Sequence, residues 1–450
     1  MTEERIRNHE TEKNSSVSHG CAYGAFTAGL RIGNETNPVT SSETFISEEI
    51  VENTSAGESE HKDKEDVDRS DSAAGVPTST PASEPQQETK IIETSKPQSK
   101  PMPKDTSAKR SDGLTENQYS KITDYLDSFY SSIGDFSVSV KPDLFASGSI
   151  EKLETTIWNS MIAVRERSLI DLHISYYNFS LRIADIRTIS PSKVEVEVWE
   201  SCDQQYAGLS VLSREFDIEH HFTLELGDDS IWRISNHKSE CNPFYVFKYD
   251  ASSNSDAKIG TVLSNIGMRN AQYGGEIKEE PACDHPYNRA AAVEYAHQWV
   301  NARNPNYKAY DALGGNCMNF ASQVLHAGGI RQTDGWFFES PKRFYRSWIN
   351  VDGFTAYATS ASPDKLLCDV NANYYSGQPG DLILMGIDSP TNHATIICDV
   401  VKDGDGRTAD YLLCSNTSNL ENFPASAYYY TNQRLVQIFG WNDVPAEKLP

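Results

Sequence analysis

Two residues in the C-terminal third of the chain are of the types that carry out nucleophilic catalysis. Cys317 lies in the stretch GGNCMNFASQVLHAGG at 314–329, and His393 opens the stretch HATIICDVV. A cysteine thiolate attacks a carbonyl carbon, and a nearby imidazole holds the thiol proton and returns it to the leaving group. The pair therefore predicts cysteine-dependent acyl transfer, which requires no metal and no cofactor.

Such a reaction also needs a polar group that orients the imidazole and hydrogen-bond donors for the oxyanion. The stretch CSNTSN at 414–419 supplies two asparagines, and a third directly precedes the cysteine. An asparagine after a strand is equally typical of a simple turn. The predicted catalytic residues are Cys317, His393 and Asn416, and the predicted oxyanion- or substrate-binding residues are Asn316 and Asn419.

A helix that begins at Cys317 is the element expected to position the thiol. Apolar side chains follow the cysteine at the spacing of one buried helical face, and Gly328 and Gly329 end the pattern. Free N–H groups and the helix dipole in the first turn favour a thiolate, so we expect the pKa of Cys317 to be lowered. Gly314 and Gly315 let the backbone bend sharply before it. An inert core cysteine is the alternative.

An antiparallel sheet is the element expected to position the histidine. The segments GDLILMGI, HATIICDVV, ADYLLCSNT and RLVQIFGWN read as its strands. Because His393 starts one of them, we expect its imidazole at the sheet edge, facing a helix packed on the sheet. A strand-end histidine bonded to a carbonyl is the alternative. Ahead of the cysteine, NRAAAVEYAHQWVNAR predicts another helix with Asn288 as its N-cap.

These stretches resemble a known family. YNRAAAVEYAHQWVNARNPNY, GGNCMNFASQVLHAGG, GDLIL, NHATII and SNTSN occur in the order seen in the bacterial putative amidase domain, which is similar to papain-like cell-wall hydrolases of the CHAP type. The resemblance covers residues 287–441. It implies Cys317 as nucleophile, His393 as general base and acid, a thioester intermediate, and a peptide or peptidoglycan substrate.

The chain also departs from the pattern of that family. Asn416 and Asn419 stand where many relatives have a histidine and an aspartate, and Asn316 stands where an aspartate is usual. A neutral amide can still orient an imidazole, as it does in papain-like enzymes. The departures therefore concern the orienting group, while the nucleophile and the base follow the pattern.

The chain divides into four parts by pattern. Residues 1–112 are rich in Ser, Thr, Glu and Pro and read as a disordered tail or stalk. Residues 113–249 predict two helices, at 115–133 and 150–171, and then antiparallel strands; this order resembles the cone-shaped α+β barrel of scytalone dehydratase and nuclear transport factor 2. Residues 250–286 read as a linker in which a short helix at 258–270 fits. Residues 287–450 form the papain-like domain, so the expected fold class is α+β.

Composition narrows the choice of partners and location. A net charge of −24 repels nucleic-acid phosphates, so we expect no nucleic-acid partner. The eight cysteines include no CxxC pair, which argues against a zinc knuckle, and a Cys202–Cys241 bridge stays open. No apolar run is long enough for a membrane span, and no signal peptide is visible at the N-terminus. The resemblance nevertheless implies an extracellular or cell-envelope location.

Two functions remain open at this stage. One is hydrolysis of an amide bond in peptidoglycan or another envelope peptide. The other is a catalytically decayed papain-like module that binds envelope material without cutting it. The reactivity of the Cys317 thiol separates the two, because a decayed site has no need of a thiolate.

Overall fold

The computed structural model describes residues 104–239, 255–313, 315–386, 391–430 and 432–444. Most of the predicted tail, residues 1–103, lies outside the described residues. Residues 104–112 were also assigned to the tail, but they pack on the folded part. Asp105 accepts a hydrogen bond from the indole Nε1 of Trp232 at 2.8 Å, and Lys109 forms a β-bridge with Thr115. The fold therefore starts before the predicted boundary at 113, because a strand side chain satisfies the Asp105 carboxylate.

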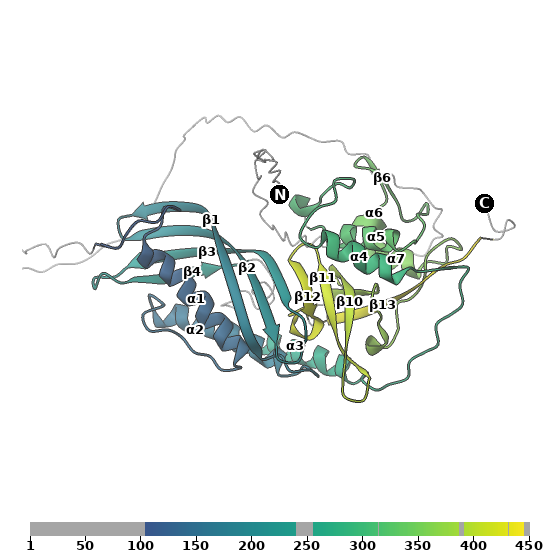
Figure 1. Ribbon diagram of the computed structural model, residues 1–450, viewed down its shortest axis with the longest axis horizontal. Coiled ribbons are helices and arrows are strands. Elements are labelled where there is room, and N and C mark those ends of the chain that lie inside the picture. Colours follow the sequence, from purple (N-terminus) through teal and green to yellow (C-terminus); the bar gives the residue numbers. More distant parts are fainter. Residues whose placement is uncertain (1–103, 240–254, 314, 387–390, 431, 445–450) are drawn as a thin grey trace, which may run out of the picture. The chain divides into compact units, whose positions relative to one another are not determined.

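Two helices and four strands form the first half of the described chain. They are α1 (Glu116–Gly134), α2 (Gly148–Arg165), β1 (Ile174–Ser190), β2 (Lys193–Tyr206), β3 (Ser213–Leu226) and β4 (Trp232–Lys238). Thr115 caps α1 with a full capping box. The second helix ends at Arg165, earlier than predicted, and the chain then turns into the long antiparallel hairpin β1–β2. Figure 1 shows both helices packed against the curved strands.

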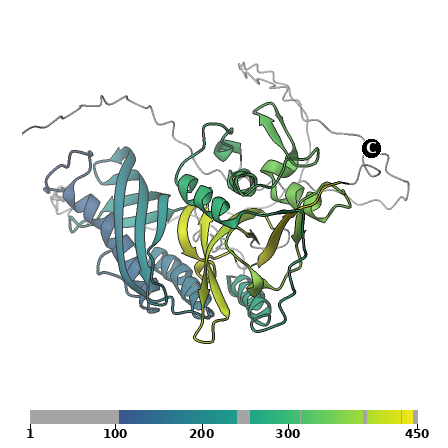
Figure 2. The ribbon, with the colours of Figure 1, turned by 45° about the vertical axis from the view of Figure 1, so that its right-hand side comes forward.

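The second half contains five helices and nine strands in the described ranges, counting α-helices and strands alone. They are α3 (Ser255–Asn270), β5 (His285–Pro286), α4 (Arg289–Trp299), α5 (Cys317–Ala327), β6 (Phe338–Ser340), β7 (Arg343–Phe344), α6 (Arg346–Ile349), α7 (Val351–Thr359), β8 (Leu367–Asp369), β9 (Leu382–Gly386), β10 (His393–Lys402), β11 (Thr408–Ser415), β12 (Asn419–Pro424) and β13 (Asn432–Trp441). Figures 1 and 2 show α4 to α7 gathered on one side of strands β10 to β13. The helix predicted from residue 288 is confirmed, with the Asn288 side chain accepting from Ala291 N–H.

Part of the predicted linker is a core element. Helix α3 covers the segment where a short helix was expected, and it packs on α2 and β13. Its residues Val262 and Ile266 are buried. Two apolar side chains four positions apart give the helix a buried face, so this part of 250–286 contributes to the core and does not merely connect two domains.

Strands of both halves form one sheet, whose main path runs β1-β2-β3-β12-β11-β10-β9-β13-β5 in the described residues. Strand β4 pairs with β3 and β8 with β13, while β6 and β7 form a separate two-stranded sheet. The halves join where β12 pairs antiparallel with β3, with Glu421 opposite Arg214. One apolar cluster includes Trp158 of α2 together with Ile397 of β10. The α+β class is therefore confirmed, whereas the expectation of a separate barrel domain is wrong for these residues. The papain-like and cone-shaped arrangements stay predictions.

Both faces of the strands β9, β10 and β11 are covered. Leu382, Leu384 and Ala394 belong to a cluster with residues of α4, α5 and α7, while Ile383 and Met385 belong to the other cluster, which includes α3. Neighbouring residues of a strand point to opposite faces, so the two clusters define the two sides of the sheet. We call the first the α5 face and the second the α3 face.

None of the helices in the described part of the chain combines the length and the apolar character that crossing a lipid bilayer requires. Cys202, one half of the disulfide that the sequence left open, is a free thiol, and Cys241 lies outside the described residues.

Candidate functional site

Cys317 is the first residue of α5, as the apolar spacing predicts. Gly315, two residues before the cysteine, has φ +127°, a backbone conformation that residues other than glycine rarely adopt. This confirms the sharp bend for Gly315, while Gly314 lies outside the described residues. The predicted role of the glycines in turning the chain into the helix therefore rests on Gly315.

The environment of the thiol differs from the expected one. Cys317 is buried, and burial raises its pKa, although N–H groups of Ala394, Met318 and Cys317 itself donate to the sulfur and oppose that rise. The expectation of a lowered pKa is thus contradicted. A helix N-terminus lowers the pKa of a thiol, whereas burial in an apolar cluster raises it. For Cys317 the effect of burial is larger.

His393 does not meet the cysteine in this structure. It pairs with Met385 across the sheet, and the next residue, Ala394, pairs with Leu384. Residues paired directly across an antiparallel sheet share a face, so His393 points to the α3 face while Ala394 and Cys317 lie on the α5 face. The prediction that the imidazole faces a helix carrying the thiol is therefore wrong for this conformation.

The imidazole of His393 has its own buried surroundings. Its Nε2 lies 3.0 Å from Ser415 Oγ and 2.8 Å from Tyr428 Oη, and its ring packs against the rings of Tyr428 and Tyr430. Burial lowers the pKa of His393 to about 4. The ring is therefore neutral at pH 7, the form in which a histidine can accept a proton.

The three predicted asparagines lie close together, but they form hydrogen bonds within their own cluster and not with the His393 ring. Asn316 Nδ2 donates to Asn416 Oδ1 at 2.7 Å. Asn416 Nδ2 lies 3.1–3.3 Å from the carbonyl oxygens of residues 299, 300 and 302, at the end of α4. Asn416 thus ties the start of α5 to the end of α4, and its amide is not bonded to the His393 ring.

Asn419 belongs to the same turn between β11 and β12. Its Oδ1 accepts hydrogen bonds from Arg303 Nη2 at 3.2 Å and from Thr417 N–H at 3.3 Å. Thr417 Oγ1 in turn accepts from the Asn316 N–H at 2.5 Å. These bonds fix the loop beside the first turn of α5, so Asn419 positions the backbone next to Cys317.

A buried ion pair holds α4 on the sheet. Arg289 Nη1 lies 2.7 Å from Asp381 Oδ1, and the same oxygen accepts from Ile438 N–H at 2.9 Å. Burial raises the pKa of Asp381 to about 6, although the arginine opposes the rise. Asp381 is the aspartate of the GDLIL stretch, so this residue of the motif acts on the framework of the site.

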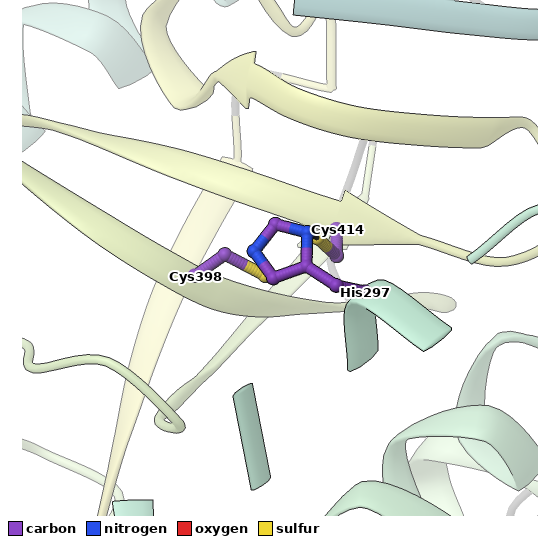
Figure 3. A group of neighbouring side chains, drawn as sticks. All are labelled: His297, Cys398 and Cys414. Atoms are coloured by element: carbon purple, nitrogen blue, oxygen red, sulfur yellow. Dashed lines mark hydrogen bonds between the residues drawn. The ribbon is translucent and has the colours of Figure 1, made fainter. Parts of the chain in front are cut away.

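An imidazole does meet a thiol elsewhere on the α5 face. His297 Nδ1 on α4 lies 3.8 Å from Cys414 Sγ on β11, and Cys398 on β10 lies beside them, as Figure 3 shows. The contact with Cys414 raises the pKa of His297 to about 9. Three separate elements supply residues 297, 398 and 414, so the residues do not form a motif of fixed spacing. A motif search of the sequence therefore does not find this cluster.

Comparison with known proteins agrees with the family resemblance in the C-terminal part. Residues 286–439 match the family model described as a putative amidase domain. Over 200 residues the chain is 30% identical to the uncharacterized protein YhbB of Bacillus subtilis (strain 168); the match covers 42% of this chain and 61% of that protein. The chain thus spans about three fifths of the length of that relative.

A solved structure is weakly similar to part of the chain. It is a crystal structure of a putative scytalone dehydratase from Novosphingobium aromaticivorans DSM 12444, with 11% sequence identity and a TM-score of 0.18, and the match covers 28% of this chain and 87% of that one. A score this low carries no argument about the fold. The functional suggestion rests on the family match. Residues 286–439 are similar to a putative amidase domain, and this similarity suggests amide hydrolysis.

Proposed function

We propose that the C-terminal part of the chain hydrolyses an amide bond with Cys317 as the nucleophile. The observation that carries the proposal is the position of this cysteine. It is the first residue of α5, within the segment similar to an amidase domain, and backbone N–H groups of Ala394, Met318 and Cys317 favour its thiolate by lowering the pKa against the effect of burial. Donors in this position stabilise a thiolate and lie close to where the oxyanion of a tetrahedral intermediate forms.

The reaction follows the steps of cysteine acyl transfer. The Cys317 sulfur attacks the amide carbonyl carbon, the thiol proton passes to His393, and the imidazolium then protonates the leaving amine. Water hydrolyses the thioester and restores the free thiol. No step requires a metal ion.

His393 has to turn for this role. It is the first residue of β10, and the backbone N–H of its neighbour Ala394 already reaches the Cys317 sulfur. A local rotation of the chain at the strand end moves the ring from Tyr428 and Ser415 to the α5 face. Catalysis in this proposal therefore includes a conformational step at the start of β10.

The proposed substrate is peptidoglycan or another envelope peptide, and the proposed location is the cell envelope or the extracellular space. The support is the resemblance of the sequence motifs to a domain that is itself similar to cell-wall hydrolases, together with an acidic chain that suits neither DNA nor RNA.

Release of soluble peptides from purified peptidoglycan tests the function. Wild type is compared with Cys317→Ala and His393→Ala, and Cys368→Ala serves as the control because this half-buried thiol lies on β8, away from α5. We expect release by wild type and the control and a loss of at least about 10³-fold in both other variants. Equal release by Cys317→Ala contradicts the nucleophile.

A binding module without catalysis is the second candidate, and one observation favours it: the His393 ring lies on the α3 face while the Cys317 thiol is buried with a raised pKa. Alkylation of each cysteine by iodoacetamide against pH, read by peptide mass spectrometry, separates the candidates. An enzyme shows Cys317 reacting near pH 6 and losing that reactivity in His393→Ala. A binding module shows Cys317 unreactive below about pH 8.5, like an ordinary thiol, while peptidoglycan still binds.

A further inference from the structure

A cluster of three metal-binding side chains lies on the α5 face, apart from the Cys317 thiol. The ligand atoms of His297, Cys398 and Cys414 all lie within 4.8 Å of one another. Figure 3 shows the imidazole reaching from α4 to the two sulfurs, which project from the adjacent strands β10 and β11. Both cysteines are free thiols. The amidase mechanism uses none of these three residues.

The spacing of the ligand atoms suits a single tetrahedral ion. With Zn–S bonds of about 2.3 Å and Zn–N bonds of about 2.0–2.1 Å, a tetrahedral site separates its sulfur and nitrogen ligands by roughly 3.6 Å. The observed distance between His297 Nδ1 and Cys414 Sγ is 3.8 Å. The other two distances are at most 4.8 Å, so an ion placed between the three atoms would draw them together by roughly 1 Å or less.

A carboxylate lies beside the imidazole of the cluster, outside the three residues whose ligand atoms are all within 4.8 Å of one another, and a movement of its side chain would make it the fourth ligand. Glu421 Oε1 on β12 lies 2.9 Å from His297 Nδ1. When an ion takes the place of the proton on Nδ1, this carboxylate oxygen remains beside the ion. The other oxygen, Oε2, is held by Arg214 at 3.1 Å, which fixes the carboxylate in this orientation.

Ligand chemistry and burial select the metal. Two thiolates and an imidazole are soft or borderline ligands, a set that favours Zn²⁺ over Mg²⁺ or Ca²⁺. The sulfurs are buried in an apolar cluster, where two bare thiolates are costly, whereas two thiolates and Zn²⁺ together carry no net charge. The His297 side chain keeps 36% of its exposure and provides the route by which an ion enters.

We propose that His297, Cys398, Cys414 and Glu421 form a structural zinc site that joins α4 to strands β10, β11 and β12. Glu421 places one ligand of the site on β12, the strand that pairs with β3. Bound zinc holds α4 on the sheet and thereby steadies the end of α4, where Asn416 is bonded.

Cobalt binding by the full chain tests the site. The reduced protein is stripped with a chelator and titrated with Co²⁺. We expect one equivalent per chain, with thiolate-to-cobalt charge-transfer absorption and the intense visible bands of a tetrahedral ion, and we expect Zn²⁺ to displace it. Cys398→Ser and Cys414→Ser should lose the charge-transfer band, and Zn²⁺ should raise the melting temperature of wild type but not of these variants.

Three further variants test whether a lost signal reflects unfolding and whether the ion binds at another site. His297→Ala alters a partly exposed side chain and should fold, as judged by circular dichroism, while binding Co²⁺ at least tenfold more weakly. Cys368→Ser and Cys317→Ala should bind like wild type, which separates this site from the proposed amidase site. Charge-transfer absorption that survives in Cys414→Ser, or its absence from reduced wild type, overturns the proposal. So does a Cys398–Cys414 disulfide that resists treatment with a reductant.

Discussion

At the scale of single residues, the surroundings of Cys317 and His393 decide what each can do. The sulfur of Cys317 receives backbone N–H groups but is buried, and the ring of His393 is neutral and bonded to Ser415 and Tyr428. Each side chain alone has a property that catalysis uses: donors around a thiol, and an imidazole able to accept a proton. Because they lie on opposite faces of the sheet, the proposed mechanism depends on the rotation of His393.

The buried ring of His393 predicts a dependence of stability on pH. Its pKa is about 4 in the folded protein against 6.5 for an ordinary histidine. The unfolded chain therefore binds a proton first as pH falls, so the stabilising contribution is complete above pH 6.5 and is lost by pH 4. The loss is about 3 kcal/mol.

Urea unfolding at pH 7 and pH 4.5 checks this dependence in wild type and in His393→Gln. The glutamine variant should lose less stability over that interval than wild type. His173→Gln, at an exposed position, is the control and should follow wild type. An identical pH dependence in wild type and His393→Gln contradicts the prediction.

Asn416 predicts a second effect at this scale. Its buried amide satisfies the carbonyl oxygens at the end of α4 and the Asn316 side chain. Asn416→Ala leaves these groups without partners, which should lower the free energy of unfolding by about 3 kcal/mol. Urea denaturation measures it, with Asn306→Ala at an exposed position as the control; a change below about 0.5 kcal/mol in Asn416→Ala contradicts the role.

At the scale of elements, different kinds of contact attach helices α4 and α5 to the sheet. Helix α5 is held by its apolar face, while α4 has only two buried residues and is held by polar contacts at both ends. Arg289 and Asp381 hold its start, and Asn416 holds its end. Loss of one of these contacts should therefore loosen α4 more than α5.

Asp381→Ala should be strongly destabilising. The substitution removes the buried carboxylate that pairs with Arg289, which keeps two carbonyl acceptors, and it removes the acceptor of the Ile438 N–H. Breaking a buried pair from one side costs about 3–5 kcal/mol. Asp405→Ala, in the exposed pair with Arg407, should cost at most about 1 kcal/mol. Urea midpoints followed by circular dichroism compare the two, and equal midpoints contradict the framework role of Asp381.

At the scale of the whole molecule, the continuous sheet and the shared core couple the two halves of the described chain. Besides the β3–β12 pairing, Arg165 of α2 donates from Nε to Tyr429 Oη at 2.8 Å. Neither half buries its part of this core without the other. The halves should therefore unfold together.

A single cooperative transition is the expected result for the full chain. Tryptophan fluorescence and far-ultraviolet circular dichroism should give the same urea midpoint, because tryptophans lie in both halves, for example Trp158 and Trp348. Tyr429→Phe, which removes one bond to Arg165, should lower the common midpoint without splitting the transition. Two separate transitions in wild type contradict the coupling.

The sequence by itself determined where several elements begin and what they contain. The apolar spacing after Cys317 marked the start of α5, and Asn288 was predicted as the N-cap of α4. These features depend on neighbours within four residues along the chain, so local pattern reads them directly. The strands around His393 were found for the same reason, and so was the α+β class.

Tertiary structure alone decided which residues meet. The first six residues of β10, which include His393, are buried without alternation, as is all of β9, because helices or other packed segments cover both sides of the sheet. A strand with one wet face reveals its orientation by alternation, but a strand buried on both faces does not. The sequence therefore could not tell that His393 points away from Cys317. Nor could it bring His297, Cys398 and Cys414 together, since their meeting depends on packing among elements far apart in the chain.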